Sequence, residues 1–486
     1  MLRKRISVSE AAAQPLGTVA RRALGWSMLN NVVGRAGTTL MGVVLARILV
    51  PEDYGVYAVA LVALMALLSV NELGVSLAII RWPKDVSRIA PTVMTLAVGF
   101  SVALWIVTFF AAPLIADALN APAATAVLRV LTLSILIDAL TAVPAALMTR
   151  DFMQRERMIV DSAGFVIASA TAIGLALAGQ GAWSLVWSVL LGNIVNGAFI
   201  LWYAPRNYRP GFNAPVAREL LAFGLPLALA SLLVIALLNA GYVVVGAALG
   251  PASLGFYLLA FNLSTWPVNM FSTPARRISL PLFSRLHAGE TEASAAFAPV
   301  CAMLLLVTLP ACLLLAVFAE PLIRIVYSDK WLPAAQVLPW LMVLALTRVL
   351  GELAYDFLVA LGESRANLAV QAVWLVTLIP ALLVGVHYDG IRGVAIANAV
   401  IAAGVVIPTY AIVLRRAGVS MRIMGAELAR PLAGGLLAGA AGVGVLLLVP
   451  DNLIQLAVGA ALVGLVYLVV VYPMRGVLRA SAVGSA

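Results

Sequence analysis

The chain has 486 residues, of which 63% are hydrophobic and 11% are charged, and its formal net charge is +10. A soluble domain is about 45–50% apolar and about 25% charged, so one core cannot bury this much apolar surface and lipid must solvate most of the chain. The basic residues lie in short gaps between apolar runs and form no single patch, which excludes a nucleic-acid-binding surface and suits the anionic inner leaflet of a membrane.

Apolar runs of about 20 residues, each able to span a hydrocarbon layer of about 30 Å, follow one another along the chain. No gap between them is long enough for a soluble domain or for the sizeable catalytic loops of a membrane glycosyltransferase, polymerase or ligase, so an enzyme is not expected. The sequence predicts an all-α polytopic membrane protein with about fourteen transmembrane helices. These are expected near 24–49, 54–80, 92–115, 127–149, 158–178, 182–203, 220–249, 254–279, 298–319, 337–361, 366–386, 393–414, 432–450 and 453–472.

Basic residues set the expected orientation. The first 22 residues are polar and basic, which predicts a cytoplasmic tail before an uncleaved first helix. With this end inside, the two tails and the alternate inner segments hold 24 of the 31 Lys and Arg, whereas the outer gaps hold only Arg324, Lys330 and Arg392. Because Lys and Arg accumulate on the cytoplasmic side, both termini are predicted to face the cytoplasm.

One segment repeats at an offset of 200 residues: five of sixteen positions in 45–60 recur in 245–260, including Pro51 as Pro251 and Tyr57 as Tyr257. Each segment is an outer turn after an odd-numbered helix, which implies two parallel six-helix lobes related by an axis along the membrane normal. Shared turn chemistry is the alternative explanation. The predicted domains are a cytoplasmic tail (1–22), an N-terminal lobe (23–205), a cytoplasmic linker (206–218), a C-terminal lobe (219–416), helices thirteen and fourteen (417–474) and a second cytoplasmic tail (475–486).

Charged side chains inside predicted helices are candidate site residues, because a charge at the bilayer centre costs at least ~2.5–3.5 kcal/mol. Arg35 lies midway along the first helix, beside Asn30 and Asn31, and no acidic residue stands three or four positions away. Its counter-charge must therefore come from another helix or from a ligand. An arginine in a wet cavity suits an anion, since its planar fork matches phosphate oxygens. We assign Arg35, Asn30 and Asn31 to substrate binding.

Acidic residues inside the helices are candidates for carrying a coupling ion. Asp138 lies midway along the fourth helix, and Glu72 lies near the inner end of the second, where it could also snorkel to the interface. Arg348, Glu352 and Asp356 share one face of the tenth helix at spacings of four residues. We assign Arg348 to substrate binding and the acids to ion coupling, with a structural Arg348–Glu352 ion pair as the alternative.

No metal or cofactor is expected. Cys301 and Cys312 fall in one apolar run, about 16 Å apart along a helix, which is too far for a disulfide. The two histidines, His287 and His387, are far apart in sequence, so a metal site is not predicted. The sequence has no Walker motif for ATP, so coupling to an H⁺ or Na⁺ gradient or to downstream consumption is favoured.

The stretch 45–55, LARILVPEDYG, resembles the first-helix signature of Wzx-type polysaccharide flippases, which belong to the multidrug/oligosaccharidyl-lipid/polysaccharide exporter superfamily. The stretches 71–74, 144–152 and 249–257 agree with it. The resemblance extends over about residues 20–420 and is strongest for the colanic-acid-exporter-like branch.

The resemblance implies a two-lobed, V-shaped transporter of the bacterial inner membrane that flips a polyprenyl-diphosphate-linked oligosaccharide to the outer leaflet by alternating access. It also implies a cationic cavity for the diphosphate, membrane lipids as neighbours, and a polysaccharide polymerase or export machinery as possible partners. Arg35 matches that cavity by position, whereas the acids beside Arg348 do not suit it. The alternative is a small-molecule or cation antiporter of the same superfamily, in which Asp138 and Glu352 would be central.

Overall fold

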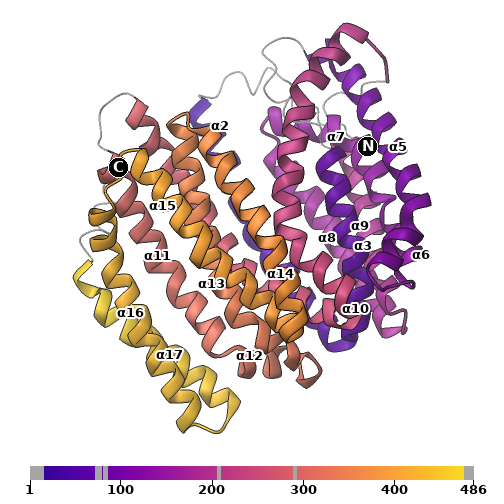
Figure 1. Cartoon of the computed structure of the whole chain (residues 1–486). Helices are drawn as coiled ribbons and strands as arrows, with labels where there is room; N and C mark the ends of the chain where they lie inside the picture. The colour runs from indigo at the N-terminus through magenta and orange to yellow at the C-terminus, as the bar shows by residue number, and fades with distance from the viewer. Residues whose placement is uncertain (1–15, 72–78, 80–85, 205–209, 288–292, 475–486) are drawn as a thin grey trace. The chain divides into compact units, whose positions relative to one another are not determined.

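The computed structural model describes the chain apart from residues 1–15, 72–78, 80–85, 205–209, 288–292 and 475–486 (Figure 1). Every element of the described part is a helix, as the apolar runs predict. A helix pairs its backbone N–H and C=O groups internally, which is why an apolar chain in lipid takes this form. The chain divides into two compact units, the N-terminal unit (1–236) and the C-terminal unit (237–486).

The described helices of the N-terminal unit are α2 (Leu16–Ile48), α3 (Pro51–Asn71), the short 3₁₀ helix η1 (Val86–Arg88), α5 (Ala90–Ala118), α6 (Ala124–Leu131), α7 (Ser134–Arg150), α8 (Gln154–Leu177), α9 (Ala182–Tyr203) and the first part of α10 (Ala214–His287).

The described helices of the C-terminal unit are the rest of α10, α11 (Ala293–Val317), α12 (Ala319–Val326), η2 (Asp329–Trp331), α13 (Leu332–Ala360), α14 (Ser364–Ile401), the π-helical η3 (Ala402–Val406), α15 (Ile407–Arg416), α16 (Met421–Leu448), α17 (Asn452–Val471) and η4 (Tyr472–Met474). The predicted lobes stay a prediction, since this division does not test their boundaries.

Eleven stretches of the described residues are long and apolar enough to cross a membrane. Two of them contain non-helical residues, Gly250 in α10 and the pair Asp389–Gly390 in α14. Counting both halves of each, and adding the 33-residue α2, gives the fourteen helices expected from the sequence. The helices extend past their apolar centres: α10 begins at Ala214, inside the predicted linker, and α16 begins at Met421, ahead of the apolar run.

Two glycine turns extend the internal repeat beyond what the sequence revealed. Gly181, between α8 and α9, has φ 51° and ψ −130°, and Gly390, within α14, has φ 51° and ψ −133°. Positive φ values of this kind favour glycine. Gly181 packs against Asp53, and Gly390 packs against Leu249. Each glycine turn therefore lies against the turn that carries the sequence repeat in its own unit.

The short helices α6 and α12 are a further matching pair. Each has eight residues, ATAVLRVL and AEPLIRIV, with arginine in sixth place. Arg129 of α6 donates from Nε to the Phe109 carbonyl at 3.0 Å, and its guanidinium carbon lies 4.5 Å from the centre of the Phe109 ring. The stretch Ala124–Arg150 is one apolar span, as predicted at 127–149, with a short break between α6 and α7.

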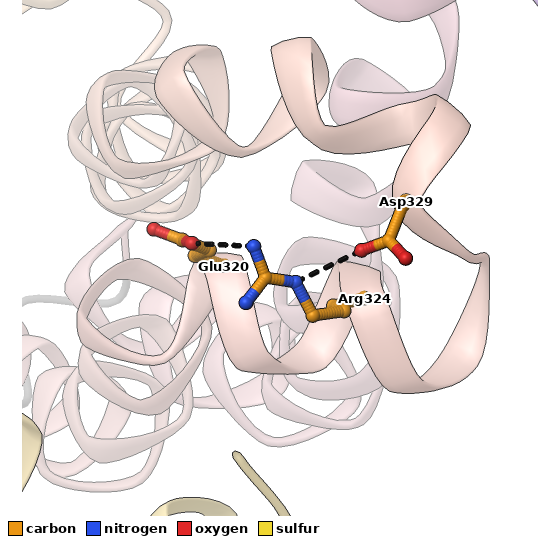
Figure 2. A network of polar contacts seen from close by, with 3 residues as sticks. All are labelled: Glu320, Arg324 and Asp329. Carbon is orange, nitrogen blue, oxygen red and sulfur yellow. Dashed lines mark hydrogen bonds and ion pairs between the residues drawn. The ribbon is translucent and has the colours of Figure 1, made fainter. Parts of the chain in front are cut away.

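Arg324 of α12 contacts carboxylates, whereas Arg129 of α6 contacts an aromatic ring. It pairs with Glu320 at 3.1 Å and with Asp329 at 2.9 Å, and Figure 2 shows the guanidinium lying between the two acids. Glu320 and Asp329 are well exposed and Arg324 is partly exposed, so the network lies at the surface. It joins α12 to η2 at the start of α13.

Small residues allow several helices to approach closely, as is usual in membrane bundles. A Cβ on Gly192 of α9 would lie 2.9 Å from the Cβ of Ala168 on α8. In the C-terminal unit, α16 and α17 run side by side (Figure 1) and pack on α11, where a Cβ on Gly435 would lie 2.5 Å from Leu309. Cys301 and Cys312 of α11 are buried and free.

Candidate functional site

A cavity of about 650 Å³ lies within the N-terminal unit and is called the N-terminal cavity below. Ligand-binding pockets in proteins usually measure about 300–1,000 Å³, so this space has the size of a small-molecule site. Its wall consists of residues from α3, α5, α7, α8 and α9. The polar members of the wall are Tyr57, Ser134, Asp138, Thr141, Thr149, Arg157, Asp161, Asn193 and Asn196.

Helical spacing explains how the wall forms. Side chains three, four or seven residues apart lie on one face of a helix, so a stripe at this spacing can line a single space. α7 contributes a stripe from Ser134 to Thr149, and α9 contributes one from Val189 to Ile200. On α8 the wall residues Arg157 and Asp161 are four residues apart.

Two charged side chains of the wall are held by hydrogen bonds. Asn30 of α2 donates from Nδ2 to Oδ2 of Asp161 at 2.8 Å. Arg157 donates from Nη1 to the Thr149 hydroxyl at 2.8 Å, and that hydroxyl donates to the Ala145 carbonyl at 3.1 Å. Hydrogen bonds to ionised groups are roughly twice as strong as neutral ones, so both groups keep a defined direction.

Asp138 lies in the same wall, on α7, and its side chain is exposed. The wall therefore has two carboxylates, Asp138 and Asp161, against one guanidinium, Arg157. This balance favours a cation over an anion in the N-terminal cavity. The cavity thus differs from the arginine-dominated space that the sequence led us to expect around Arg35.

Asn196 adds an unsatisfied acceptor to the wall. Its Oδ1 is buried and has no hydrogen-bond partner among the described residues. An unpaired buried acceptor costs about 1–3 kcal/mol, which a donor entering the cavity would recover. Asn196 lies where α8 and α9 approach closely, since a Cβ on Gly164 would lie 3.3 Å from the Asn196 Cβ.

Arg35 lies outside this wall. Its side chain is exposed on α2, and it makes no ion pair or side-chain hydrogen bond with any residue that the structure describes. The side chain of Asn31 and the whole of Glu72 fall outside the described residues, so their predicted roles stay predictions.

In the C-terminal unit Arg348 belongs to an aromatic and charged cluster. Its guanidinium carbon lies 6.0 Å from the centre of the Phe261 ring, and it interacts electrostatically with Glu352 and with Tyr242. The ion pair predicted between Arg348 and Glu352 stays a prediction, because no salt bridge joins these two side chains among the described residues. Asp356, one turn beyond Glu352, is buried, with 4% of its surface exposed.

The same cluster contains Tyr257, the repeat counterpart of Tyr57. The Tyr257 ring lies 5.5 Å from that of Tyr242, edge to face, and Tyr242 lies 5.2 Å from Phe261. Asn398 donates from Nδ2 to the Tyr257 hydroxyl at 3.3 Å. Aromatic rings fill this region and polar groups within it pair with one another.

A family model described as "Polysaccharide biosynthesis protein" matches residues 44–336. The chain belongs to this family. It is 25% identical over 380 residues to the lipopolysaccharide biosynthesis protein WzxC of Escherichia coli (strain K12), covering 76% of each chain. It is 28% identical over 340 residues to the succinoglycan biosynthesis transport protein ExoT of Rhizobium meliloti (strain 1021), covering 68% of this chain and 66% of the relative.

Solved structures share the fold of this family member. The lipid II flippase MurJ in an inward closed conformation matches with a TM-score of 0.77 at 15% identity, covering 93% of this chain and 100% of that chain. An inward-facing multidrug resistance transporter of the MATE family matches with a TM-score of 0.59 at 18% identity, covering 78% of this chain and 95% of that one. At these identities the likeness shows an all-helical polytopic membrane fold. The chain is a multi-pass membrane protein.

The family match includes the entire wall of the N-terminal cavity and leaves out Arg35 and Arg348. Our sequence reasoning found Asp138 in this wall and missed Asp161, Arg157, Asn193 and Asn196. Arg157 and Asp161 lie near the start of α8, where charged residues are usual because helix ends lie at the membrane interface. The two asparagines, three residues apart in an apolar helix, were the signal that could have revealed the site.

Proposed function

We propose that this polysaccharide biosynthesis family member moves a polyprenyl-diphosphate-linked oligosaccharide from the inner to the outer leaflet of a bacterial inner membrane by alternating access. The proposal is supported by the agreement between the sequence relatives and the structural neighbour, which point to the same kind of transporter. Two relatives are titled as lipopolysaccharide and succinoglycan biosynthesis proteins, the second of them a transport protein. The structure with a TM-score of 0.77 is titled a lipid II flippase.

Arg35 is the residue that we assign to the diphosphate, with Asn30 and Asn31 beside it and Arg348 as a second cation. A guanidinium exposed midway along a membrane helix costs at least ~2.5–3.5 kcal/mol if it faces lipid tails. We therefore infer that the face of α2 that carries Arg35 meets water and the headgroup. The planar guanidinium can bind two phosphate oxygens at once.

The membrane potential would assist the movement. A diphosphate carries about two negative charges, and a potential of ~100 mV, negative inside, favours its outward transfer by roughly 2 × 2.3 kcal/mol. Both termini are expected to face the cytoplasm, as the basic residues predict. Asp138, Glu352, Glu72 and Asp356 remain our candidates for a coupling H⁺ or Na⁺, and a polymerase or export complex is the expected downstream partner.

The test is surface polysaccharide in a strain that lacks the chromosomal gene and carries plasmid-borne variants. Arg35→Ala should lower the polysaccharide at least about tenfold while the protein still inserts, because a hydrogen bond to a charged group contributes about 1.5–3 kcal/mol. Arg35→Lys should keep part of the output, since it keeps the charge and loses the fork. The matched control is Arg88→Ala, an exposed arginine on η1. Full export by Arg35→Ala would remove Arg35 from the mechanism.

A second candidate function has one specific observation in its favour. The N-terminal cavity has two carboxylates against one guanidinium, which suits the cations that a multidrug-type antiporter exports. This candidate predicts efflux of cationic dyes that Asp138→Asn abolishes. Dye efflux without any effect of gene deletion on surface polysaccharide would favour the antiporter over the flippase.

A further inference from the structure

The N-terminal cavity is long as well as large. Along α7 its wall extends from Ser134 to Thr149, a distance of about 22 Å at 1.5 Å per helical residue. Its volume of about 650 Å³ is far more than a single hydrated ion needs. Arg35, which we assign to the diphosphate, lies outside the wall. The cavity therefore has room for an organic group other than the diphosphate.

The hydroxyls of α7 present hydrogen-bond acceptors to this space. Ser134 donates its proton to the Leu131 carbonyl at 2.7 Å, and Thr141 donates to the Ile137 carbonyl at 3.1 Å. A hydroxyl has one proton and two lone pairs. Because both protons are used within the protein, these two groups have only acceptor capacity left for a ligand.

The remaining polar groups of the wall include both donors and acceptors. The Asn196 Oδ1 is a buried acceptor without a partner among the described residues. The donors are the amides of Asn193 and Asn196, the Tyr57 hydroxyl and the part of Arg157 that does not bind Thr149. A ligand that satisfies this wall must therefore donate hydrogen bonds as well as accept them.

Sugar hydroxyls meet this requirement, since each one donates one hydrogen bond and can accept two. An ionised phosphate or carboxylate only accepts, so it would leave the acceptors of α7 and Asn196 unpaired. It would also be repelled by Asp138 and Asp161, which outnumber the single guanidinium of Arg157 in the wall. The Tyr57 ring offers the apolar surface against which the C–H groups of a sugar can pack.

We propose that the N-terminal cavity is a subsite for a neutral hexose unit of the transported glycan, and that it discriminates against acidic sugars. Ser134, Thr141 and Asn196 accept hydrogen bonds from the sugar hydroxyls, and the carboxylates Asp138 and Asp161 repel a uronic acid. This inference rests on the proposed function for the identity of the substrate. It adds to that function a part of the protein that selects the glycan, separate from the arginine assigned to the diphosphate.

The experiment measures how far sugars protect a cysteine in the wall of the detergent-solubilised, full-length protein. The background carries Cys301→Ala and Cys312→Ala. The reporter is Ala142→Cys, in the wall one turn beyond Asp138. The control reporter is Gly174→Cys, since a Cβ at Gly174 on α8 meets nothing within 4 Å. N-ethylmaleimide labelling is timed at neutral pH with the methyl glycosides of glucose, galactose and mannose, and with those of the corresponding uronic acids.

Protection should depend on the charge of the sugar. At about 10 mM, roughly ten times the ~1 mM dissociation constant usual for so small a ligand, at least one hexoside should slow labelling of Ala142→Cys about fivefold or more. The uronides should slow it less than about twofold, because the wall repels them. Labelling of Gly174→Cys should not change with any of the sugars.

Three variants test the residues that carry the inference. Asn196→Leu and Thr141→Val each remove one acceptor and should raise the hexoside dissociation constant about threefold or more. The matched control Gln180→Leu, at an exposed amide between α8 and α9, should leave it unchanged. Asp138→Asn should narrow the difference between hexoside and uronide by about fivefold, the effect of one charge a few ångströms away in water.

Three results would overturn the subsite: no protection by any hexoside, equal protection by the uronides, or unchanged hexoside binding in both Asn196→Leu and Thr141→Val. Protection by the organic cation tetraphenylphosphonium alone would also overturn it and favour the antiporter. Labelling needs no transport. Normal polysaccharide export without hexoside protection would therefore refute the subsite and leave the flippase proposal standing, whereas protection without any effect of gene deletion on surface polysaccharide would count against the flippase alone.

Discussion

Tyr57 and Tyr257 occupy equivalent positions of the internal repeat, yet their surroundings differ. Tyr57 lines the N-terminal cavity of about 650 Å³. Tyr257 is 1% exposed and lies among Tyr242, Phe261 and Asn398. The backbone features of the two units match at their glycine turns and short helices, so the scaffold is common while the interior side chains have diverged.

The charges differ in the same way. In the N-terminal unit Asp138 and Asp161 line a cavity, whereas in the C-terminal unit Glu352 stands one turn from Arg348, whose guanidinium carbon lies 6.0 Å from the centre of the Phe261 ring. An acid beside a cavity can exchange a cation with water, and an acid that compensates an arginine within a packed cluster cannot do so without leaving that arginine uncompensated. The comparison therefore favours the N-terminal unit for ion coupling and the C-terminal cluster for stability.

The largest expected effect comes from removing the two tyrosine rings. Tyr257→Ala should lower the free energy of unfolding by about 3–5 kcal/mol, because it opens a hole in a packed cluster and removes the partner of Asn398. Tyr57→Ala should cost under about 1.5 kcal/mol, since one side of that ring already borders a cavity. Unfolding of the detergent-solubilised protein by increasing SDS measures both. Equal losses would mean that the two interiors are packed alike.

The next largest expected effect is the difference in stability between variants of Glu352 and of Asp138. Glu352→Gln should destabilise the protein by about 1–3 kcal/mol, because Arg348 loses its compensating charge. Replacing Arg348 by Met together with Glu352 by Leu should recover most of this loss. Asp138→Asn should change stability by less than about 1 kcal/mol and reduce polysaccharide export. A destabilising Asp138→Asn together with a neutral Glu352→Gln would reverse the assignment of roles.

Substitutions at the two glycine turns should have smaller effects on stability, and the two turns can be compared directly. Gly390→Ala should cost about 1–2 kcal/mol through its positive φ alone, because a Cβ there would make an ordinary contact with Leu249 at 3.7 Å. Gly181→Ala should cost more, since its Cβ would lie 2.5 Å from the Asp53 carboxylate, which accepts the Val50 N–H at 3.3 Å. Melting temperatures of the two variants test the order. Identical losses would show that Asp53 moves aside freely.

The smallest effect concerns the short helices α6 and α12. Arg324→Ala should cost no more than about 1 kcal/mol, and raising the salt concentration should erase the difference, because its partners Glu320 and Asp329 are exposed. Arg129→Ala should cost about 1–1.5 kcal/mol at any salt concentration, since Arg129 uses a ring face and a carbonyl. Melting curves at low and high salt distinguish the two.

Hydropathy was sufficient for the all-helical fold and for the number of helices, because lipid leaves a chain few other ways to pair its backbone. It was insufficient for helix ends. The first turns of α16, residues 421–430, are helical although they contain Arg422, Glu427 and Arg430. The break at Thr132 between α6 and α7 lies in a continuous apolar run, so no change of composition marks it.

The candidate site was predicted in part. Asp138 stood out because a charge in the middle of an apolar helix is costly. Asp161 did not, since its partner Asn30 is 131 residues away and only the tertiary fold brings them together. The Tyr57 and Tyr257 environments could not be distinguished either, because the sequence repeat treats the two positions as equal.

The matching glycine turns have an evolutionary consequence. If the two halves descend from one duplicated ancestor, each inherited the same fixed corners, and mutation at those corners is penalised in both. Residues that line the cavity, such as Tyr57, carry a smaller penalty than residues of the packed cluster, so the half with the cavity can change its cargo preferences while the packed half keeps the protein folded. Families that must follow rapidly changing surface sugars would gain evolvability from a scaffold of this kind.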